Sequence, residues 1–222
     1  MRTHARLWLA PAIGAAFGAV TAVVDNIPRM QGVIGQAHSD DGAVTWTAIY
    51  FSKHLDTGWS WAALGFLLGL LSGAGARPAR AATLGAVASA VGLVFATVGF
   101  YGVEPLVGTS HDRGFIIYWL MGSVVCGLPL GVLGATARRR SVLGLIAALT
   151  IPVGAATQMV VFPLWLGLPG ESSADAWAQA TVWVGAIMGA AFVVVRYGRS
   201  LLARRHPDQQ VQDGLVESTQ TI

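Results

Sequence analysis

Histidine and acidic residues occur together at three places between the apolar blocks of this chain. The sequence reads His38-Ser39-Asp40-Asp41, His54-Leu55-Asp56 and His111-Asp112. Imidazole and carboxylate groups together suit zinc or another transition metal. Their spacing matches no established metal motif, and solvated loops commonly collect such residues. A metal site and an ordinary hydrated rim therefore both stay open, and the candidate metal ligands are His38, His54 and His111.

Further polar residues lie where the same ends of the apolar blocks are expected. Asp25 and Arg113 would each be costly to hold near lipid without a partner or water. We hypothesise that they line one hydrated outer cavity, where an ion pair between them is one arrangement. The residues assigned to this candidate outer vestibule are Asp25, Asn26, Glu104, Arg113, Gln158 and Gln179.

The middle of every long apolar block lacks Asp, Glu, Lys, Arg and His. Proton-coupled pumps and transporters usually keep an ionisable residue at that depth. Cys126 is the only titratable side chain there, and a thiol in apolar surroundings is normally inert. No nucleophile–base pairing or phosphate-binding glycine loop stands out. The sequence therefore indicates no catalytic residue and no cofactor, and it argues against an enzyme without deciding the question.

Composition places the chain in a membrane. Of its 222 residues, 54% are hydrophobic and 11% are charged, whereas soluble domains carry about 25% charged residues. The formal net charge of +3 would suit nucleic acid, but the arginines lie at the ends of the apolar blocks, where membrane topology explains them. We therefore expect the lipid bilayer, and not nucleic acid, as the partner.

Six blocks are long and apolar enough to cross the bilayer as helices. The sequence thus predicts an all-α polytopic protein with a six-helix transmembrane domain over residues 1–202. An outer loop over 27–57 would carry a short interfacial helix near 43–53, because that stretch is too short to span and rich in aromatic residues. Residues 203–222 are polar and are predicted to be a disordered tail. The predicted spans are 7–26, 58–76, 81–102, 115–137, 141–164 and 176–196.

Loop charges predict the orientation. Eleven Lys and Arg residues fall on one side of the six spans and three on the other, so both termini should be cytoplasmic in a multi-pass protein of the inner (plasma) membrane. The N-terminal stretch MRTHAR followed by LWLAPAIGAAFGAVTA also resembles a signal peptide, so cleavage of the first span stays open.

Glycines recur every four residues along four of the predicted spans. A glycine has no side chain, so it lets two helix backbones approach closely in lipid. Packing within the chain is the plain interpretation, and a substrate groove or a dimer seam is the functional one. The glycines assigned to helix packing are Gly14, Gly18, Gly65, Gly69, Gly73, Gly127, Gly131, Gly185 and Gly189.

The stretch HLDTGWSWAALGFLLG over 54–69, with the arginine turn after it, resembles a group of uncharacterised bacterial six-helix membrane proteins, a domain of unknown function. The resemblance covers the second to the fifth span. It implies a fold and a membrane location, but no activity and no functional residues.

Two functional hypotheses follow. The first is a passive facilitator for a small solute, or a membrane subunit that supports a partner. The second is an outward-facing module that binds or senses a ligand or a metal. A facilitator needs a polar path through the bundle, whereas a binding module needs only an outer cup. The sequence leaves open a homo-oligomer or a partner membrane protein.

Overall fold

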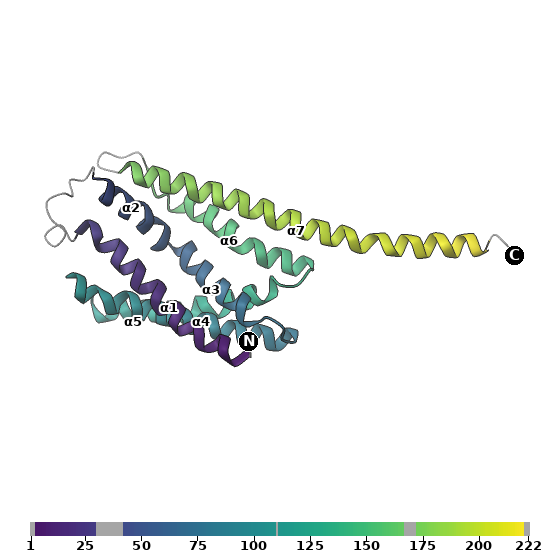
Figure 1. The fold of residues 1–222 in the computed structure, drawn as a ribbon, viewed down its shortest axis with the longest axis horizontal. Helices are drawn as coiled ribbons and strands as arrows, with labels where there is room; N and C mark the ends of the chain where they lie inside the picture. The colour runs from purple at the N-terminus through teal and green to yellow at the C-terminus, as the bar shows by residue number, and fades with distance from the viewer. Residues whose placement is uncertain (1–2, 30–41, 110, 167–171, 220–222) are drawn as a thin grey trace.

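The computed structural model describes residues 3–29, 42–109, 111–166 and 172–219, and every regular element in them is helical. Figure 1 shows the helices side by side, with a long C-terminal helix that leaves the bundle. The elements are α1 Thr3–Asn26, η1 Ile27–Arg29, α2 Ala43–Leu55, α3 Gly58–Ser72, α4 Pro78–Val103, η2 Glu104–Val107, α5 Arg113–Thr136, α6 Val142–Val161 and α7 Ser173–Thr219.

Five of the described helices are long and apolar enough to cross a membrane, which indicates a membrane-embedded protein. They are Leu9–Asn26, Pro78–Val107, Arg113–Thr136, Val142–Val161 and Ser173–Arg199. The end of the bundle that holds the N-terminus of α7 is here termed the outer end, following the predicted orientation. The opposite end is termed the inner end.

The predicted second span, 58–76, is shorter than expected. Helix α3 has 15 residues and ends at Ser72, so it is only about 22 Å long, against a hydrocarbon core of roughly 30 Å. The cause is the Gly73-Ala74-Gly75 turn, in which Gly75 has a left-handed φ of 79°. Among the described residues, five of the six predicted spans are thus long enough to cross, and the sixth crossing stays a prediction.

Helices α1, α3, α4 and α5 form a core in which backbone packs on backbone. A Cβ built on Gly14 or Gly18 of α1 would overlap the carbonyls of Gly92 and Ala96 on α4. On α5, a Cβ at Gly131 would overlap the backbone of Gly85 on α4. Gly69 and Gly127 likewise lie against backbone, whereas Gly65 faces side chains of α4 and α5 and Gly73 faces Cβ of Ala135.

The packing role assigned to two glycines of α7 is corrected by the structure. A Cβ at Gly185 would meet nothing within 4 Å, and one at Gly189 would touch only Pro152 at an ordinary 3.6 Å. The four-residue spacing is the same as in the core helices. However, only Gly189 meets a neighbouring helix in this chain, and it does so without the close backbone approach seen in the core.

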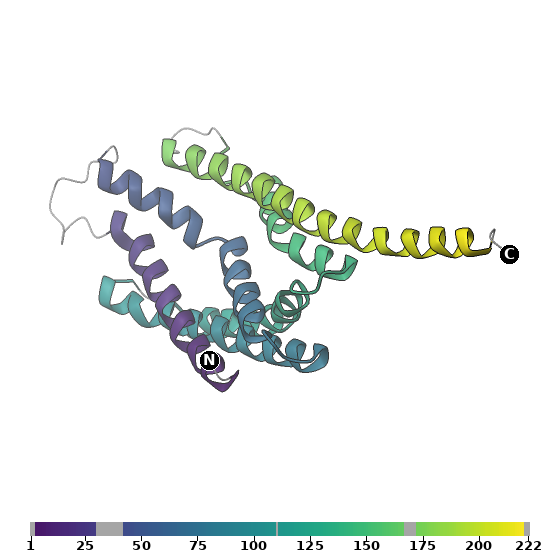
Figure 2. The same cartoon turned by 45° about the vertical axis from the view of Figure 1, so that its right-hand side comes forward.

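Helices α6 and α7 form a hairpin beside that core (Figures 1 and 2). Near the outer end, Met159 of α6 and Val182 of α7 pack in one apolar cluster with Trp59 of α3. Near the inner end, Phe66 and Ala147 join α3 to α6. The backbone of α7 continues as helix over 203–219, where the sequence predicts a disordered tail, and the disorder of that tail in solution stays a prediction.

Helix α2, where the sequence predicts a short helix near 43–53, runs lengthwise along α7, and its interfacial location stays a prediction. Trp46 contacts Ser173 and His54 contacts Thr181, with the same separation of 127 residues in both pairs. A constant separation means that the two helices are parallel and in register over about two turns. Near its start α2 is close to the end of α1, and it leads directly into α3 (Figure 2).

Candidate functional site

The break between α2 and α3 is the polar centre of the outer half of the bundle. Helix α2 ends at Leu55 and α3 begins at Gly58, so backbone groups on both sides of the break lack helical partners. The Ser60 hydroxyl lies 2.6 Å from the Leu55 carbonyl and 2.7 Å from the Thr57 carbonyl, and it can donate to either. Irregular backbone inside a membrane protein persists only where such partners exist.

The N-terminus of α3 is capped by a different helix. The side-chain oxygen of Gln158, on α6, accepts from the backbone N–H of Trp59 at 2.8 Å. By contrast, α5 and α6 are capped from within their own segments, by Asp112 and Ser141. Thr57 stands at the capping position of α3 but makes no side-chain capping bond. The start of α3 therefore depends on the position of α6.

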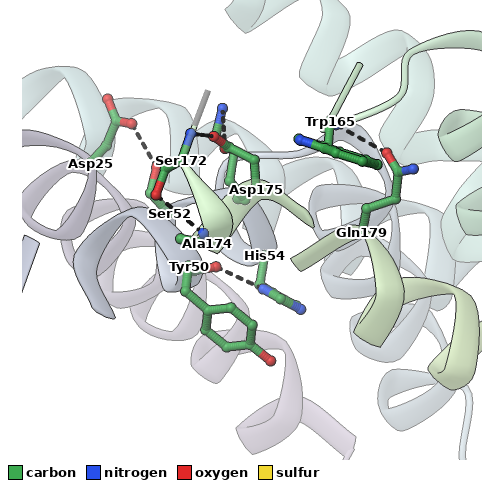
Figure 3. Close-up of polar contacts among 10 residues, drawn as sticks. Asp25, Tyr50, Ser52, His54, Trp165, Ser172, Ala174, Asp175 and Gln179 are labelled. Carbon is green, nitrogen blue, oxygen red and sulfur yellow. Dashed lines mark hydrogen bonds and ion pairs between the residues drawn. The ribbon is translucent and has the colours of Figure 1, made fainter. Parts of the chain in front are cut away.

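Helix α7 is capped locally as well. The backbone N–H of Ser172 donates to a carboxylate oxygen of Asp175 at 3.0 Å, and the Ser172 hydroxyl accepts from the N–H of Ala174 at 3.1 Å. This reciprocal arrangement resembles a capping box and satisfies two orphan donors. It fixes the outer end of α7, against which α2 packs (Figure 3).

Three side chains form a hydrogen-bonded group between α2 and α7. Nδ1 of His54 lies 2.8 Å from the carbonyl of Tyr50, and Nε2 lies 2.8 Å from Oγ1 of Thr181. A carbonyl can only accept, so Nδ1 carries a proton. The phenol of Tyr50 donates to the same threonine oxygen at 3.2 Å. Both ring nitrogens of His54 are thus engaged by protein atoms.

Two further contacts close the outer rim of the break (Figure 3). The Ser52 hydroxyl of α2 donates to Asp25 at the end of α1, at 2.8 Å. Lys53 forms an ion pair with Asp175 of α7 at 3.3 Å. Helix α2 is therefore tied to α1 on one side and to α7 on the other, entirely by side chains.

Two hydrogen-bond donors near the break have no acceptor among the described residues. The indole Nε1 of Trp59 is buried and has no acceptor among the described residues. The ring of Trp59 lies 6.4 Å, centre to centre, from the ring of His54. The side-chain amide nitrogen of Gln158 likewise donates to no residue in the described part of the chain, because only its oxygen is used. A buried N–H without an acceptor is costly, so the indole is suited to a group that the protein itself does not supply.

The structure brings only some of the predicted vestibule residues together. Asp25 and Gln158 both reach the region of the break, from α1 and α6. Asn26 is buried and donates to the Ala22 carbonyl of its own helix. Gln179 accepts from the backbone N–H of Trp165, in the segment that follows α6. These residues share the outer end, and each contacts a different partner.

Glu104 and Arg113 lie apart from the break. Glu104 is buried and pairs with His111 at 2.7 Å, close to the ring of Tyr101. Arg113 is exposed at the start of α5, and no ion pair joins it to Asp25.

The candidate metal ligands are not gathered in the described residues, where no three His, Cys, Asp or Glu side chains could share an ion. His54 and His111 belong to separate contacts, with Thr181 and Glu104. His38 lies outside the described residues.

Sequence reasoning did not assign Tyr50, Ser52 or Thr181 to the site. Tyr50 and His54 are four residues apart, so they share one face of a short helix, and this was a usable signal. No comparable signal marks Thr181, because its role depends on the packing of α7 against α2.

Residues 55–161 match the model of a family described as Family of unknown function (DUF6518). This match confirms the resemblance to an uncharacterised family for the stretch from the last residue of α2 to the end of α6. No curated protein and no solved structure matches the chain.

Proposed function

We propose that this membrane-embedded protein binds a small polar solute from its outer side, at the break between α2 and α3. The proposal rests on two N–H donors that have no acceptor among the described residues, the Trp59 indole and the Gln158 amide. Both lie beside the start of α3, which is capped by a side chain of another helix. Membrane transporters place binding sites at such discontinuous helices, because helix ends offer backbone groups to a ligand.

The break lies inside the bundle on this proposal because α2 and α3 together make one crossing. Their 13 and 15 residues follow each other with only Asp56 and Thr57 between them. Helix α2 accompanies α7 for about eight residues from its outer end, which corresponds to roughly 12 Å of helix. The break then falls well below the outer surface, where a ligand is partly shielded from bulk water.

The available groups specify the chemistry of the ligand. Both the indole and the amide are N–H donors, so the solute must present hydrogen-bond acceptors such as carbonyl, hydroxyl or carboxylate oxygens. Lys53 is already paired with Asp175, and the break itself contains Asp56, so the charge nearest the break is negative. A neutral or weakly charged, oxygen-bearing solute fits best.

Binding is favoured over passive conduction by the packing of the inner half. Phe66, Ala137 and Ala147 form an apolar cluster there, with Leu70, Leu133 and Ile151 packed against it. A facilitator would need polar groups along this region. A cup closed on its inner side by apolar residues instead suits an outward-facing binding or sensing module.

The test uses the purified full-length chain and a thermal-shift screen against polyols, amino acids and short carboxylates. A solute that binds the native state raises the melting temperature by mass action. Trp59→Phe keeps the ring but removes the indole N–H. We expect it to abolish the shift while leaving the unliganded melting temperature unchanged or slightly raised.

Trp61→Phe is the matched control, because Trp61 packs toward Phe17 and Phe100 on the other side of α3. It should retain the ligand-induced shift. Loss of the shift in both variants, or in neither, would refute the assignment of the site to the Trp59 indole.

A further inference from the structure

A basic pocket lies at the inner end of the molecule, opposite the α2–α3 break. It encloses about 280 Å³ between the segment that joins α5 to α6 and the last apolar turns of α7. This volume is just below the roughly 300–1,000 Å³ of pockets that enclose drug-sized ligands. The lining residues are Arg138, Arg140, Arg196, Tyr197 and Arg199.

The floor of this basic pocket is fixed. Tyr197 is buried, and its hydroxyl donates to the carbonyl of Ala137 at the end of α5. Arg138 donates to the carbonyl of Leu70 on α3 at 3.1 Å, which holds its guanidinium in place. The pocket is therefore built from two segments locked to each other by hydrogen bonds.

The pocket concentrates positive charge. No carboxylate of the described residues lies within ion-pair distance of Arg138, Arg140 or Arg199. Helix α6 begins at Val142, directly after these arginines, so the positive end of its dipole adds to their field. Guanidinium groups bind phosphate through paired N–H donors, so the pocket is suited to a phosphate-bearing anion.

A separate apolar groove lies further along α7, toward the outer end. This groove, of about 380 Å³, lies between α6 and α7 and is lined by residues that include Pro152, Ala156, Trp183 and Ala190. Trp183, Ala190 and Tyr197 are spaced by seven residues, so they lie on one face of α7. The groove thus starts about 10 Å from the pocket floor along the axis of α7 and extends to about 21 Å from it.

The near end of this groove is within reach of the acyl chain of a phospholipid held at the pocket. Half of the hydrocarbon core is about 15 Å thick, so a chain in the inner leaflet meets the groove where it begins, near Ala190. The apolar part of α7 ends at the arginines, where lipid headgroups begin. Basic pockets between transmembrane helices on the cytoplasmic side are typical sites for anionic headgroups.

We propose that the pocket holds the phosphate of an anionic phospholipid, whose acyl chain reaches the near end of the α6–α7 groove at Ala190. The arginines select the negative headgroup, and the groove selects a long chain over a soluble phosphate. This site is independent of the α2–α3 break and of its proposed solute.

The test measures lipid binding to the purified full-length chain by native mass spectrometry, with a melting-temperature readout in parallel. Phosphatidylglycerol and phosphatidylcholine with the same acyl chains are compared, and inorganic phosphate forms a third arm. Wild type should retain phosphatidylglycerol preferentially and should not be stabilised by phosphate. Each pocket arginine near the surface contributes about fivefold to affinity, so Arg140→Gln with Arg199→Gln should lower the preference roughly 20- to 30-fold.

The matched control is Arg77→Gln with Arg80→Gln, which removes the same charge from an exposed turn at the inner end. It should change the preference less than twofold. Ala190→Trp, which fills the groove and leaves the arginines intact, should weaken retention of the long-chain lipid. Should the pocket variant fail to fold, the Ala190→Trp result and the comparison of the two lipids on wild type decide the question.

Three results would overturn the proposal. Equal losses in the pocket and control variants would mean diffuse surface attraction. Equal retention of the two lipids by wild type would mean no headgroup selection. Stabilisation by inorganic phosphate alone would identify a soluble anion as the ligand.

Discussion

Gly131→Ala should be among the most damaging single-methyl changes in this protein. A Cβ at this position of α5 would lie 2.5 Å from the carbonyl carbon of Gly85 and 2.7 Å from Cβ of Ser89, both on α4. Ordinary contact begins at 3.4 Å, so clearing the carbonyl carbon alone requires α4 and α5 to separate by about 0.9 Å, and the carbonyl oxygen of Gly85 is closer still. The obstructing atoms are mostly backbone, which cannot rotate away, so the cost should reach the upper part of the 1–3 kcal/mol range for overpacking.

The matched control is Gly122→Ala on the same helix. A Cβ at Gly122 would meet nothing within 4 Å, so only helix propensity changes, and alanine should stabilise by about 0.5–1 kcal/mol. The two variants should therefore shift the melting temperature of the purified protein in opposite directions. A loss of about 3 kcal/mol corresponds to roughly 6–12 °C for a domain of this size. Equal melting temperatures for the two variants would refute backbone contact between α4 and α5.

Two further predictions concern orientation and the His54 group. In a Cys126→Ser background, Leu106→Cys at the outer end should react with an impermeant maleimide in intact cells, whereas Ala79→Cys in the arginine turn should not, and the reverse pattern would invert the topology. Thr181→Val should lower the melting temperature by the equivalent of about 1–3 kcal/mol, because Nε2 of His54 and the Tyr50 phenol both lose a partner. Thr83→Val, which removes only a bond to the carbonyl of Ala79 in its own helix, should be nearly neutral, and equal losses would assign no special role to the His54 group.

The helices were predictable because the hydrocarbon core imposes a minimum length on an apolar block. The predicted span 81–102 corresponds to α4 at Pro78–Val103, and 115–137 corresponds to α5 at Arg113–Thr136. The same length criterion overestimated the length of α3, because an apolar block without charged residues can still end in a turn. Charge marks where a helix must leave lipid, whereas the glycines after Ser72 mark where this helix stops.

Packing contacts were less predictable, because spacing identifies a face without identifying what covers it. Gly69 and Gly185 occur in the same four-residue pattern. Gly69 lies against the backbone of Gly131, whereas Gly185 has open space around it. Only the arrangement of the helices distinguishes them.

The candidate site was partly predictable for a similar reason. Gln158 stands out as an amide in an apolar helix, and such a side chain needs a partner. Its partner is the backbone N–H of Trp59, 99 residues earlier, and a backbone group carries no signature in the sequence. The prediction of an ion pair between Asp25 and Arg113 considered only side chains. Asp25 instead meets a serine on α2, a helix that was expected at the membrane surface.

The extent of the family match separates the two proposals. Residues 55–161 include Trp59, the helix break and Gln158, so the complete donor pair of the proposed solute site lies within the matched region. They also include Arg138 and Arg140, but not Arg196 or Arg199, so only two of the four arginines of the basic pocket lie within it. Helix α7 supplies the rest of the pocket and one wall of the groove. If the solute site is the function of the family, it can be assembled by the matched helices, whereas the lipid site requires the packing of α7 against them.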